Sequence, residues 1–292
     1  MADFTNSALL VTGASGQFGQ LALEELLARG ATRIIAGTRE PDKLRAFAER
    51  GVEVRRLDFD DKAGLPTAFS GAERVLMIST DTVGTRVEQH RNAVEAATAA
   101  NVRHITYTSA PSPRPNQIGA SPEHYWTEQM IVSSGLEFAL LRNHIYSEMV
   151  LMAAGSALKS GQLLDATAGL GRSYVSRADA ARTAAGALLG ADGKAIHDVT
   201  GPAAVTQEEV ARLLTELSGK GVARVGLDPD ALRGGMLQAG LPPGMVDVLV
   251  AFDEDAALGY HAVVTDAVEQ FSRRKPQSLA DVLQANRAAL AG

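Results

Sequence analysis

The sequence predicts an α/β protein with a doubly wound parallel sheet and a smaller, mostly helical C-terminal lobe. Short apolar runs alternate with segments of helical period over the first 142 residues, which is typical of parallel strands joined by helices. The runs are apolar at consecutive positions, as expected for strands that helices cover on both faces. With 292 residues the chain is about twice the commonest domain size, so one large domain and a main domain with a companion both fit its length.

The first strand is expected at residues 8–12, where nearly every side chain is apolar. A glycine-rich turn separates it from a helix whose apolar face contains Leu23 and Leu26 and which ends at Gly30. The alternation then continues. Strands are predicted at 33–37, 52–56, 75–78, 104–108 and 138–141, and helices at 41–50, 86–100 and 122–134.

The pattern weakens after residue 145. A helix is predicted at 146–159, strands at 172–175 and 196–200, and a helix at 178–189. A further helix begins near Thr206, since the next turn is acidic, and helical segments dominate from there onward. We therefore predict a sheet domain at 1–145, completed by segments within 172–200, and an interleaved second lobe at 146–292.

The composition excludes several classes of function. Lysine and arginine number 28 against 34 acidic residues, and this net charge of −6 is evenly spread, so no footprint for nucleic acid is present. The absence of cysteine excludes disulfides, a thiolate nucleophile and Cys-bound zinc, and the six histidines lack metal-ligand spacing. No apolar run approaches the roughly 18 residues of a membrane span, and no signal-peptide pattern precedes the first strand. We expect a cytoplasmic protein with no metal, nucleic acid or membrane partner.

The most specific motif is Gly13-Ala14-Ser15-Gly16-Gln17-Phe18-Gly19, which joins the first strand to the first helix. In a Gly-x-x-Gly-x-x-Gly turn, the first glycine permits a tight turn and the second lets the backbone approach a pyrophosphate. The third lets the helix pack closely on the strand, and the helix N-terminus adds free N–H groups. The motif lacks the Gly-Lys-Ser/Thr ending of a triphosphatase loop. It therefore favours a Rossmann-type dinucleotide site over ATP hydrolysis.

The end of the second strand indicates which nicotinamide cofactor binds. NAD sites usually place a carboxylate there for the ribose hydroxyls, whereas this strand ends with Thr38-Arg39 and has no carboxylate before Glu40. Because a guanidinium can fork onto a 2′-phosphate, NADPH is favoured over NADH. The alternative is a surface arginine paired with Glu40 or Asp42.

With these motifs, the chain resembles the NmrA-like branch of the atypical short-chain dehydrogenases. Within that branch it is most similar to the bacterial NAD(P)H:quinone oxidoreductases of type 2 and the triphenylmethane reductases. The resemblance covers nearly the full length. Besides the glycine turn, it rests on Arg39-Glu40-Pro41, Val83-Gly84-Thr85-Arg86, Gln89-His90-Arg91-Asn92, Tyr107-Thr108-Ser109, Leu140-Leu141-Arg142-Asn143, Tyr146-Ser147-Glu148, Ser176-Arg177-Ala178-Asp179 and Leu241-Pro242.

The resemblance implies that the first lobe holds NADPH and that the C-terminal lobe caps the nicotinamide and forms the substrate pocket. The implied cofactor-binding residues are Gly13, Ser15, Gly16, Gln17, Phe18, Gly19 and Arg39 for the phosphates, Asp58 and Phe59 for the adenine, Ser79 and Thr80 for the centre, and Thr108, Ser109, Asn143 and Tyr146 for the nicotinamide. The residues from the later strands agree with the rule that ligands bind at the carboxyl ends of parallel strands.

Several of these residues also have a purely structural interpretation. Asp58 could cap the helix near Asp61, and Ser79 could be an ordinary strand-end hydroxyl. Asp179 is interpreted as a helix cap rather than a catalytic acid. Arg142, at the end of an apolar strand, is interpreted as a structural ion-pair partner.

The catalytic pattern departs from that of ordinary short-chain dehydrogenases. In their Tyr-x-x-x-Lys motif, the spacing of four puts both side chains on one helix face, and the lysine lowers the pKa of the tyrosine. This chain has Tyr125-Trp126-Thr127-Glu128-Gln129, and a neutral amide cannot bias Tyr125 by charge. The catalytic candidates are therefore Tyr125, Gln129 and Asn143, and we do not expect Tyr125 to act as an activated acid.

This departure bears on the acceptor. Reduction of a simple ketone benefits strongly from an acid, whereas a quinone or cationic dye spreads the incoming charge over a conjugated system. The sequence thus favours an NADPH-dependent reductase of conjugated acceptors without flavin or metal. Its pocket wall is expected from Trp126, Tyr146, Met149, Met152 and residues 237–250. Two alternatives stay open: a non-catalytic NAD(P)-binding sensor of the NmrA type, and a biosynthetic ketoreductase or ene-reductase with an active Tyr125. A homodimer is also left open.

Overall fold

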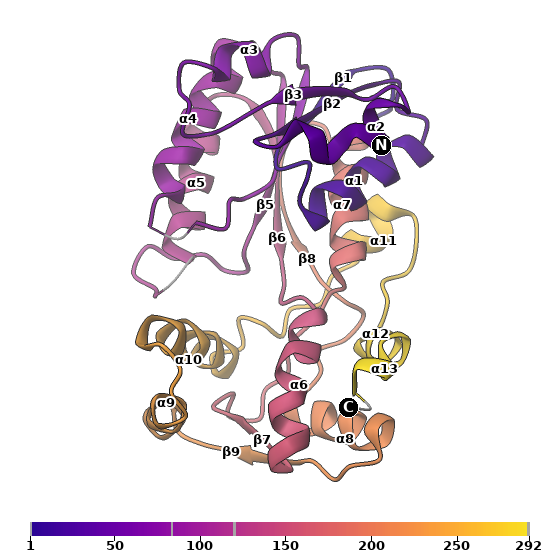
Figure 1. Cartoon of the computed structure of the whole chain (residues 1–292). Helices are drawn as coiled ribbons and strands as arrows, with labels where there is room; N and C mark the ends of the chain where they lie inside the picture. The colour runs from indigo at the N-terminus through magenta and orange to yellow at the C-terminus, as the bar shows by residue number, and fades with distance from the viewer. Residues whose placement is uncertain (1, 83, 119–120, 291–292) are drawn as a thin grey trace.

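Seven parallel strands form the central sheet in the order β3-β2-β1-β4-β5-β6-β8 (Figure 1). The computed structural model describes residues 2–82, 84–118 and 121–290, so Val83 of the quoted motifs lies outside the described residues. The strands are β1 (Ala8–Val11), β2 (Arg33–Thr38), β3 (Glu53–Arg56), β4 (Arg74–Met77), β5 (His104–Ser109), β6 (Glu137–Asn143) and β8 (Lys194–Val199). The predicted fold class is confirmed.

Helices cover both faces of the sheet, which explains why the strands are apolar at consecutive positions. Leu9 and Val11 of β1 join one buried core, whereas Leu10 joins the other. On the first face lie α1 (Gln17–Ala28), α7 (Arg177–Gly190) and α11 (Ala267–Ser272), with η1 (Pro41–Leu44) and α2 (Arg45–Ala48) nearby; on the second lie α3 (Leu65–Phe69), α4 (Arg86–Ala99) and α5 (Ser121–Ser133) (Figure 1).

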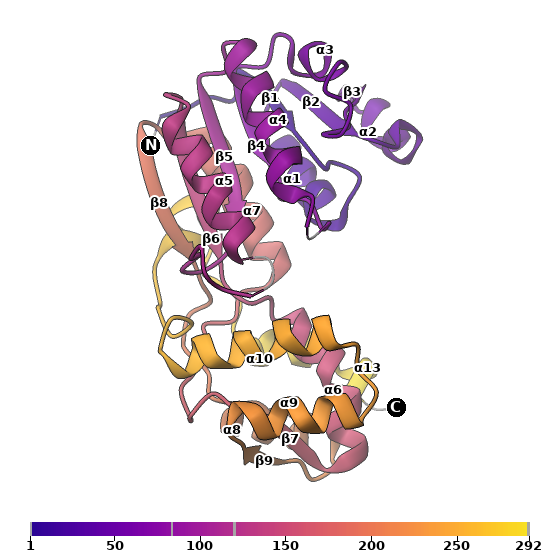
Figure 2. The ribbon, with the colours of Figure 1, turned by 90° about the vertical axis from the view of Figure 1, so that its left-hand side faces the viewer.

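A smaller lobe lies beyond one end of the sheet and has its own apolar cores (Figure 2). It contains α6 (Glu148–Ser160), α8 (Gln207–Ser218), α9 (Pro229–Gln238), α10 (Pro243–Ala257), α12 (Leu279–Ala285) and α13 (Arg287–Leu290). Two further strands, β7 (Gln162–Asp165) and β9 (Ala223–Gly226), pair in parallel as a separate sheet. Among the helices described, none is long and apolar enough to cross a bilayer.

The sequence missed some elements of the fold. It did not predict α3, β7 or β9, which are only four or five residues long. The strand predicted at 172–175 is wrong: this segment forms only two single bridges, Tyr146 with Val175 and Arg172 with Val205. The alternation of its residues is typical of a strand, but each bridge is isolated, because the residues next to it do not pair with a neighbouring strand.

A buried arginine ties the second half of the chain to the sheet. Arg74 of β4 donates from Nε to the Leu188 carbonyl at 2.6 Å and from Nη2 to the Ala191 carbonyl at 2.5 Å, at the end of α7. Its guanidinium also lies 3.9 Å from the ring centroid of Phe4. Burial lowers the pKa of Arg74 to about 10, so it keeps its charge at neutral pH.

We predict that Arg74→Ala lowers the free energy of unfolding by about 3 kcal/mol, because it opens a cavity and leaves two buried carbonyls without a donor. The matched control is Arg33→Ala, which removes an exposed arginine and its surface pair with Glu73. That control should cost less than about 1 kcal/mol. Equal losses in urea titrations of the two variants would contradict the role assigned to Arg74.

Candidate functional site

The loops that follow the strands meet at the edge of the sheet that faces the smaller lobe (Figure 1). Because all strands of the main sheet are parallel, their carboxyl ends reach this same edge. The glycine turn after β1 and the segments after β2, β4, β5 and β6 all contribute residues here. Ligands of open parallel sheets bind at such an edge.

The glycine turn brings the N-terminus of α1 to the edge. Gly13 has φ of +58°, and a Cβ on Gly19 would lie 2.5 Å from the Gly13 carbonyl oxygen, so both positions require glycine. Gly16 is the N-cap, no side chain caps the helix, and its first turn contains no acidic residue. The first-turn amides and the positive end of the helix are therefore available to an anion.

Three side chains of this turn are held by different partners. Ser15 Oγ lies 2.7 Å from Thr38 Oγ1, which ties the turn to the end of β2. The exposed Gln17 accepts from Arg177 Nη1 at 3.1 Å. The ring of Phe18 packs against the core below α1. These contacts fix the turn from both sides, so its backbone amides need little rearrangement to bind a ligand.

Arg39 lies exposed directly after β2. Its two acidic neighbours have other partners, since Glu40 pairs with Lys43 at 2.7 Å and Asp42 with Arg45 at 3.9 Å. Within the described ranges, Arg39 makes no ion pair. The alternative in which Arg39 is neutralised by Glu40 or Asp42 is therefore wrong.

The two residues predicted for the adenine lie in a turn after β3. Asp58 Oδ1 accepts from the backbone N–H of Asp60 at 3.1 Å, so the carboxylate caps this turn. The interpretation of Asp58 as a helix cap is wrong, because the next helix, α3, begins only at Leu65 and has Gly64 as its N-cap. The ring of Phe59 is buried and packs edge-on against His90, with 6.1 Å between centroids. An adenine contact by Phe59 would thus involve its backbone rather than its ring.

The segment after β4 is held by Thr108, His90 and Arg86, and the sequence did not predict this role for them. Ser79 N–H donates to Thr108 Oγ1 at 2.8 Å, and Thr80 N–H donates to His90 Nε2 at 3.2 Å. Arg86 Nε donates to the Thr80 carbonyl at 2.7 Å. Thr80 Oγ1 is itself buried without a hydrogen-bond partner in the described structure. The segment is therefore fixed while one hydroxyl stays free.

A buried polar cluster behind this segment connects α4, α5 and β5. Glu123 Oε1 accepts from the Gly84 N–H at 2.8 Å and lies in the same cluster as Arg86, whose Nη1 is 3.4 Å from Glu123 Oε2. Tyr107 OH lies 2.8 Å from His124 Nδ1. Burial lowers the pKa of His124 to about 3, so its imidazole is neutral at physiological pH. The cluster therefore supports the segment that follows β4.

The last predicted pair lies where β6 ends. Asn143 is buried, and its Nδ2 donates to Tyr146 OH at 3.3 Å, while its Oδ1 has no partner in the described structure. Burial raises the pKa of Tyr146 to about 12, and the guanidinium of Arg177 lies 5.2 Å from the centroid of its ring. Asn143 therefore presents an unsatisfied acceptor beside a tyrosine that keeps its proton.

The Ser109 hydroxyl is hydrogen-bonded to an ion pair between Glu128 and Arg142. Its hydroxyl donates to Glu128 Oε1 at 2.6 Å, and Arg142 donates to both Glu128 oxygens at 3.0 and 2.8 Å. The hydrogen bond with Glu128 raises the pKa of Arg142. The structural interpretation of Arg142 is confirmed, and it joins α5 to β5 and β6.

The predicted catalytic pair on α5 lies away from Asn143. Gln129 is exposed and lines a groove of about 440 Å³ between α4 and α5, together with Val87, Arg91, Trp126, Met130 and Ser133. Tyr125 is half-buried and its ring meets Trp126 edge-on at 5.1 Å. No hydrogen bond among the described residues joins Tyr125 or Gln129 to Asn143. Trp126, expected in the pocket wall, lines this outer groove, and its contact with an acceptor stays a prediction.

Asp179 has a structural role. Ser176 is the N-cap of α7 and accepts from the Asp179 N–H at 3.0 Å. The buried Asp179 carboxylate accepts from Arg182 at 2.9 Å and from the Gln277 N–H at 2.8 Å. It thus stabilises the start of the helix, although Ser176 is the capping residue.

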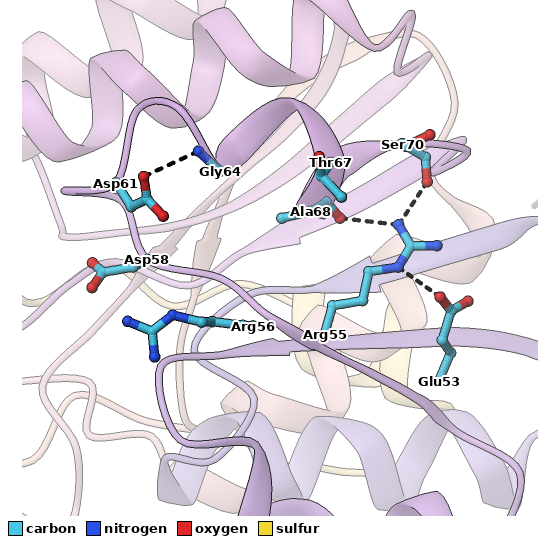
Figure 3. Close-up of a pocket in the computed structure, with 9 residues that line it drawn as sticks. All are labelled: Glu53, Arg55, Arg56, Asp58, Asp61, Gly64, Thr67, Ala68 and Ser70. Atoms are coloured by element: carbon cyan, nitrogen blue, oxygen red, sulfur yellow. Dashed lines mark hydrogen bonds and ion pairs between the residues drawn. The ribbon is translucent and has the colours of Figure 1, made fainter.

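A cavity of about 650 Å³ opens beside the edge strand β3 (Figure 3). It is lined by Glu53, Arg55, Arg56, Asp58, Asp61, Gly64, Thr67, Ala68 and Ser70. Arg55 turns toward the end of α3, whereas Arg56 extends to the side of Asp58 (Figure 3). This corner combines cationic side chains with the turn predicted for the adenine.

The edge as a whole fits a dinucleotide. It offers the uncapped N-terminus of α1 for a diphosphate. Two polar atoms there, Thr80 Oγ1 and Asn143 Oδ1, are buried without a hydrogen-bond partner in the described structure. A nucleotide could supply the missing hydrogen bonds. Across the described ranges, no group of three or more His, Asp or Glu residues is arranged to hold a metal ion.

The chain is similar to known reductases over most of its length. A family described as NAD(P)H-binding matches residues 13–190. Quinone oxidoreductase 2 of Escherichia coli is 38% identical over 255 residues, which are 86% of this chain and 88% of that protein. The crystal structure of an NADPH-dependent quinone oxidoreductase from E. coli complexed with NADPH superposes with a TM-score of 0.88 at 34% identity, covering 95% of this chain and 99% of that one.

A second solved structure agrees. Triphenylmethane reductase of Citrobacter sp., complexed with NADP(H), is 26% identical and superposes with a TM-score of 0.83, again over 95% of this chain and 99% of that one. The similarity therefore includes the smaller lobe as well as the sheet.

We predict that Gly16→Ala weakens NADPH binding about tenfold or more without loss of stability. Gly16 has ordinary extended dihedral angles, and a Cβ there would meet only the Gly13 carbonyl oxygen, at 3.4 Å. The added methyl group would, however, lie on the turn that should approach the diphosphate. Fluorescence titration with NADPH and thermal melts measure the two effects.

The matched control for this prediction is Gly155→Ala in α6, where a Cβ would meet no atom within 4 Å. It should leave NADPH binding unchanged. A Gly16→Ala variant that binds NADPH as tightly as the control would show that this turn does not hold the cofactor.

Proposed function

Because the chain belongs to the NAD(P)H-binding family, we propose that it is an NADPH-dependent reductase of quinones or other conjugated electrophiles. The 38% identity with a quinone oxidoreductase over most of the chain supports this reaction. So does the superposition on a quinone oxidoreductase and on a reductase of triphenylmethane dyes. A cytoplasmic location is part of the proposal and fits the absence of cysteine. A homodimer stays a prediction.

The preference for NADPH over NADH is supported by the end of β2. The strand ends at Thr38, whose hydroxyl is engaged with Ser15, and no carboxylate follows in the position that binds ribose hydroxyls. The exposed Arg39 has no counter-ion among the described residues and can fork onto a phosphate.

Each part of the edge has a proposed task. The first-turn amides of α1 bind the diphosphate, and Thr80 and Asn143 orient the ribose and carboxamide groups through their free oxygens. The bound nicotinamide supplies the hydride. The protein holds the nicotinamide and the acceptor close together and excludes water from between them. This lowers the entropic cost of hydride transfer.

The observation that carries the choice of acceptor is the lack of an activated acid beside Asn143. Tyr146 holds its proton, since burial raises its pKa to about 12. Tyr125 has no cationic partner four residues on, because Gln129 is neutral and faces the outer groove. A conjugated acceptor spreads the incoming charge and takes its proton from water afterwards, so it does not depend on such an acid.

The smaller lobe is proposed to cover the nicotinamide and to supply an apolar acceptor surface. Met149 and Met152 of α6 are exposed one turn apart shortly after Asn143, and Phe252 of α10 is partly exposed. Arg114, in the segment after β5, pairs with Asp255 of α10 and stacks 4.0 Å from the ring centroid of Tyr260. We take residues 146–292, apart from α7, β8 and α11, as this lobe.

The acid-independent mechanism predicts that Tyr125→Phe changes kcat with a quinone by less than about twofold, because no proton moves through this hydroxyl. NADPH oxidation at 340 nm against quinones, triphenylmethane dyes and activated ketones measures this. Loss of activity in Tyr125→Phe would favour a ketoreductase or ene-reductase instead. Tight NADPH binding without reduction of any acceptor would favour the sensor function.

The cofactor assignment predicts that Arg39→Ala raises the KM for NADPH about tenfold or more and leaves that for NADH nearly unchanged, because only NADPH carries the 2′-phosphate. The matched control is Arg45→Ala, an exposed arginine of α2 that pairs with Asp42. Equal effects of Arg39→Ala on both cofactors would contradict the assignment.

A further inference from the structure

Two consecutive arginines at the end of β3 have opposite environments. Arg55 is fully engaged: its Nε donates to Glu53 Oε1 at 2.7 Å, and its Nη1 donates to the carbonyls of Ala68 and Ser70 at 3.1 and 2.6 Å (Figure 3). Arg56 is exposed and makes no hydrogen bond or ion pair with any described residue. One arginine is therefore part of the structure, and the next has no structural task.

The strand register places Arg56 next to the predicted phosphate site. Arg56 is the partner of Thr38 in the β2–β3 ladder, and the Leu57 N–H donates to the Thr38 carbonyl at 2.9 Å. Because Arg39 directly follows Thr38, the two exposed arginines extend from the carboxyl ends of neighbouring strands. Arg55 and Arg56 line the same cavity, but Arg56 extends to the side of Asp58 and not toward the α3 carbonyls that hold Arg55 (Figure 3).

The acidic groups of this corner do not neutralise the two arginines. Glu40 pairs with Lys43, and Asp42 lies near Arg45. The Asp58 carboxylate caps its own turn and is not within ion-pair distance of Arg56. The ends of β2 and β3 therefore carry two positive charges without a counter-ion among the described residues, and a doubly charged anion can neutralise them.

We propose that Arg56 is a second ligand of the cofactor 2′-phosphate and shares with Arg39 the discrimination between NADPH and NADH. This inference rests on the proposed function, which assigns the cofactor site. A phosphate monoester has enough oxygens to accept from both guanidinium forks at once. Discrimination between NADPH and NADH then depends on residues after both β2 and β3, and not on Arg39 alone.

Binding of nucleotide fragments tests this role without any turnover. Isothermal titration calorimetry of the full-length protein would compare ADP-ribose with 2′-phospho-ADP-ribose, which differ only in the phosphate. Arg56→Gln should weaken binding of the phosphorylated fragment about tenfold and change binding of ADP-ribose less than about twofold. Arg56→Glu should weaken the phosphorylated fragment further, and Arg56→Lys should retain part of the affinity.

The adjacent arginine provides the matched control. Arg55→Gln removes the same charge one residue away and should leave the ratio of the two affinities unchanged. Thermal melts establish that each variant is folded, and the exposed position of Arg56 makes its substitution compatible with the fold.

Four results would overturn the proposal. An equal loss for both fragments in Arg56→Gln would mean that Arg56 contacts the adenosine, and no loss for either would mean that it is solvated. If Arg39→Ala removes the preference for the phosphorylated fragment while Arg56→Gln does not, the NADPH function stands and the second ligand is wrong. If the wild-type protein binds neither fragment, the proposed function fails together with this inference.

Discussion

The cofactor edge depends on one close contact, between the first turn of α1 and the backbone that follows β1. A Cβ at Gly19 would come within 2.5 Å of the Gly13 carbonyl oxygen, so only glycine lets the helix start this close to the strand. That packing aims the uncapped amides of α1 along the sheet edge. If the helix moved outward, the diphosphate would lose its ligands, and the groups placed by later strands would no longer span one dinucleotide.

The rest of the edge is fixed before any ligand binds, by polar groups buried behind it. His90 and Arg86 hold Thr80, and Glu128 holds Ser109 and Arg142. The charge therefore differs along the edge: exposed arginines without a counter-ion lie at the end of β2 and β3, whereas at the end of β6 Glu128 neutralises Arg142 and the neighbouring Asn143 is uncharged. This division suits a molecule with an anionic adenosine end and a nicotinamide end that must be kept from water.

The sheet and the glycine turn could be predicted because each follows from local sequence, whereas the choice between a free and a paired Arg39 needed the ion pairs of Glu40 and Asp42 in the structure. Leu9 and Leu10 face different cores, and this leaves an unbroken apolar run as its signature. The sequence also suggested that Arg142 had an ion-pair partner, but Glu128, which lies on another element, could only be found from the fold. The role of His90 was missed for the same reason.

Gln129 was predicted as a catalytic residue because it occupies the lysine position of the Tyr-x-x-x-Lys motif. In the structure, its side chain lines the outer groove between α4 and α5. The position of Arg56 beside Arg39 follows from the register of two strands, which no local pattern records.

The proposed reaction is direct hydride transfer without an acid supplied by the protein. The pH dependence of kcat for quinone reduction, measured with NADPH and with its 4-deuterated form, tests this reaction. We expect a slower rate with the deuterated cofactor and a kcat that is flat from about pH 6 to about pH 9, because no side chain titrates in the chemical step. A rate that falls with a single pKa in this range, and becomes flat in Tyr125→Phe, would contradict it.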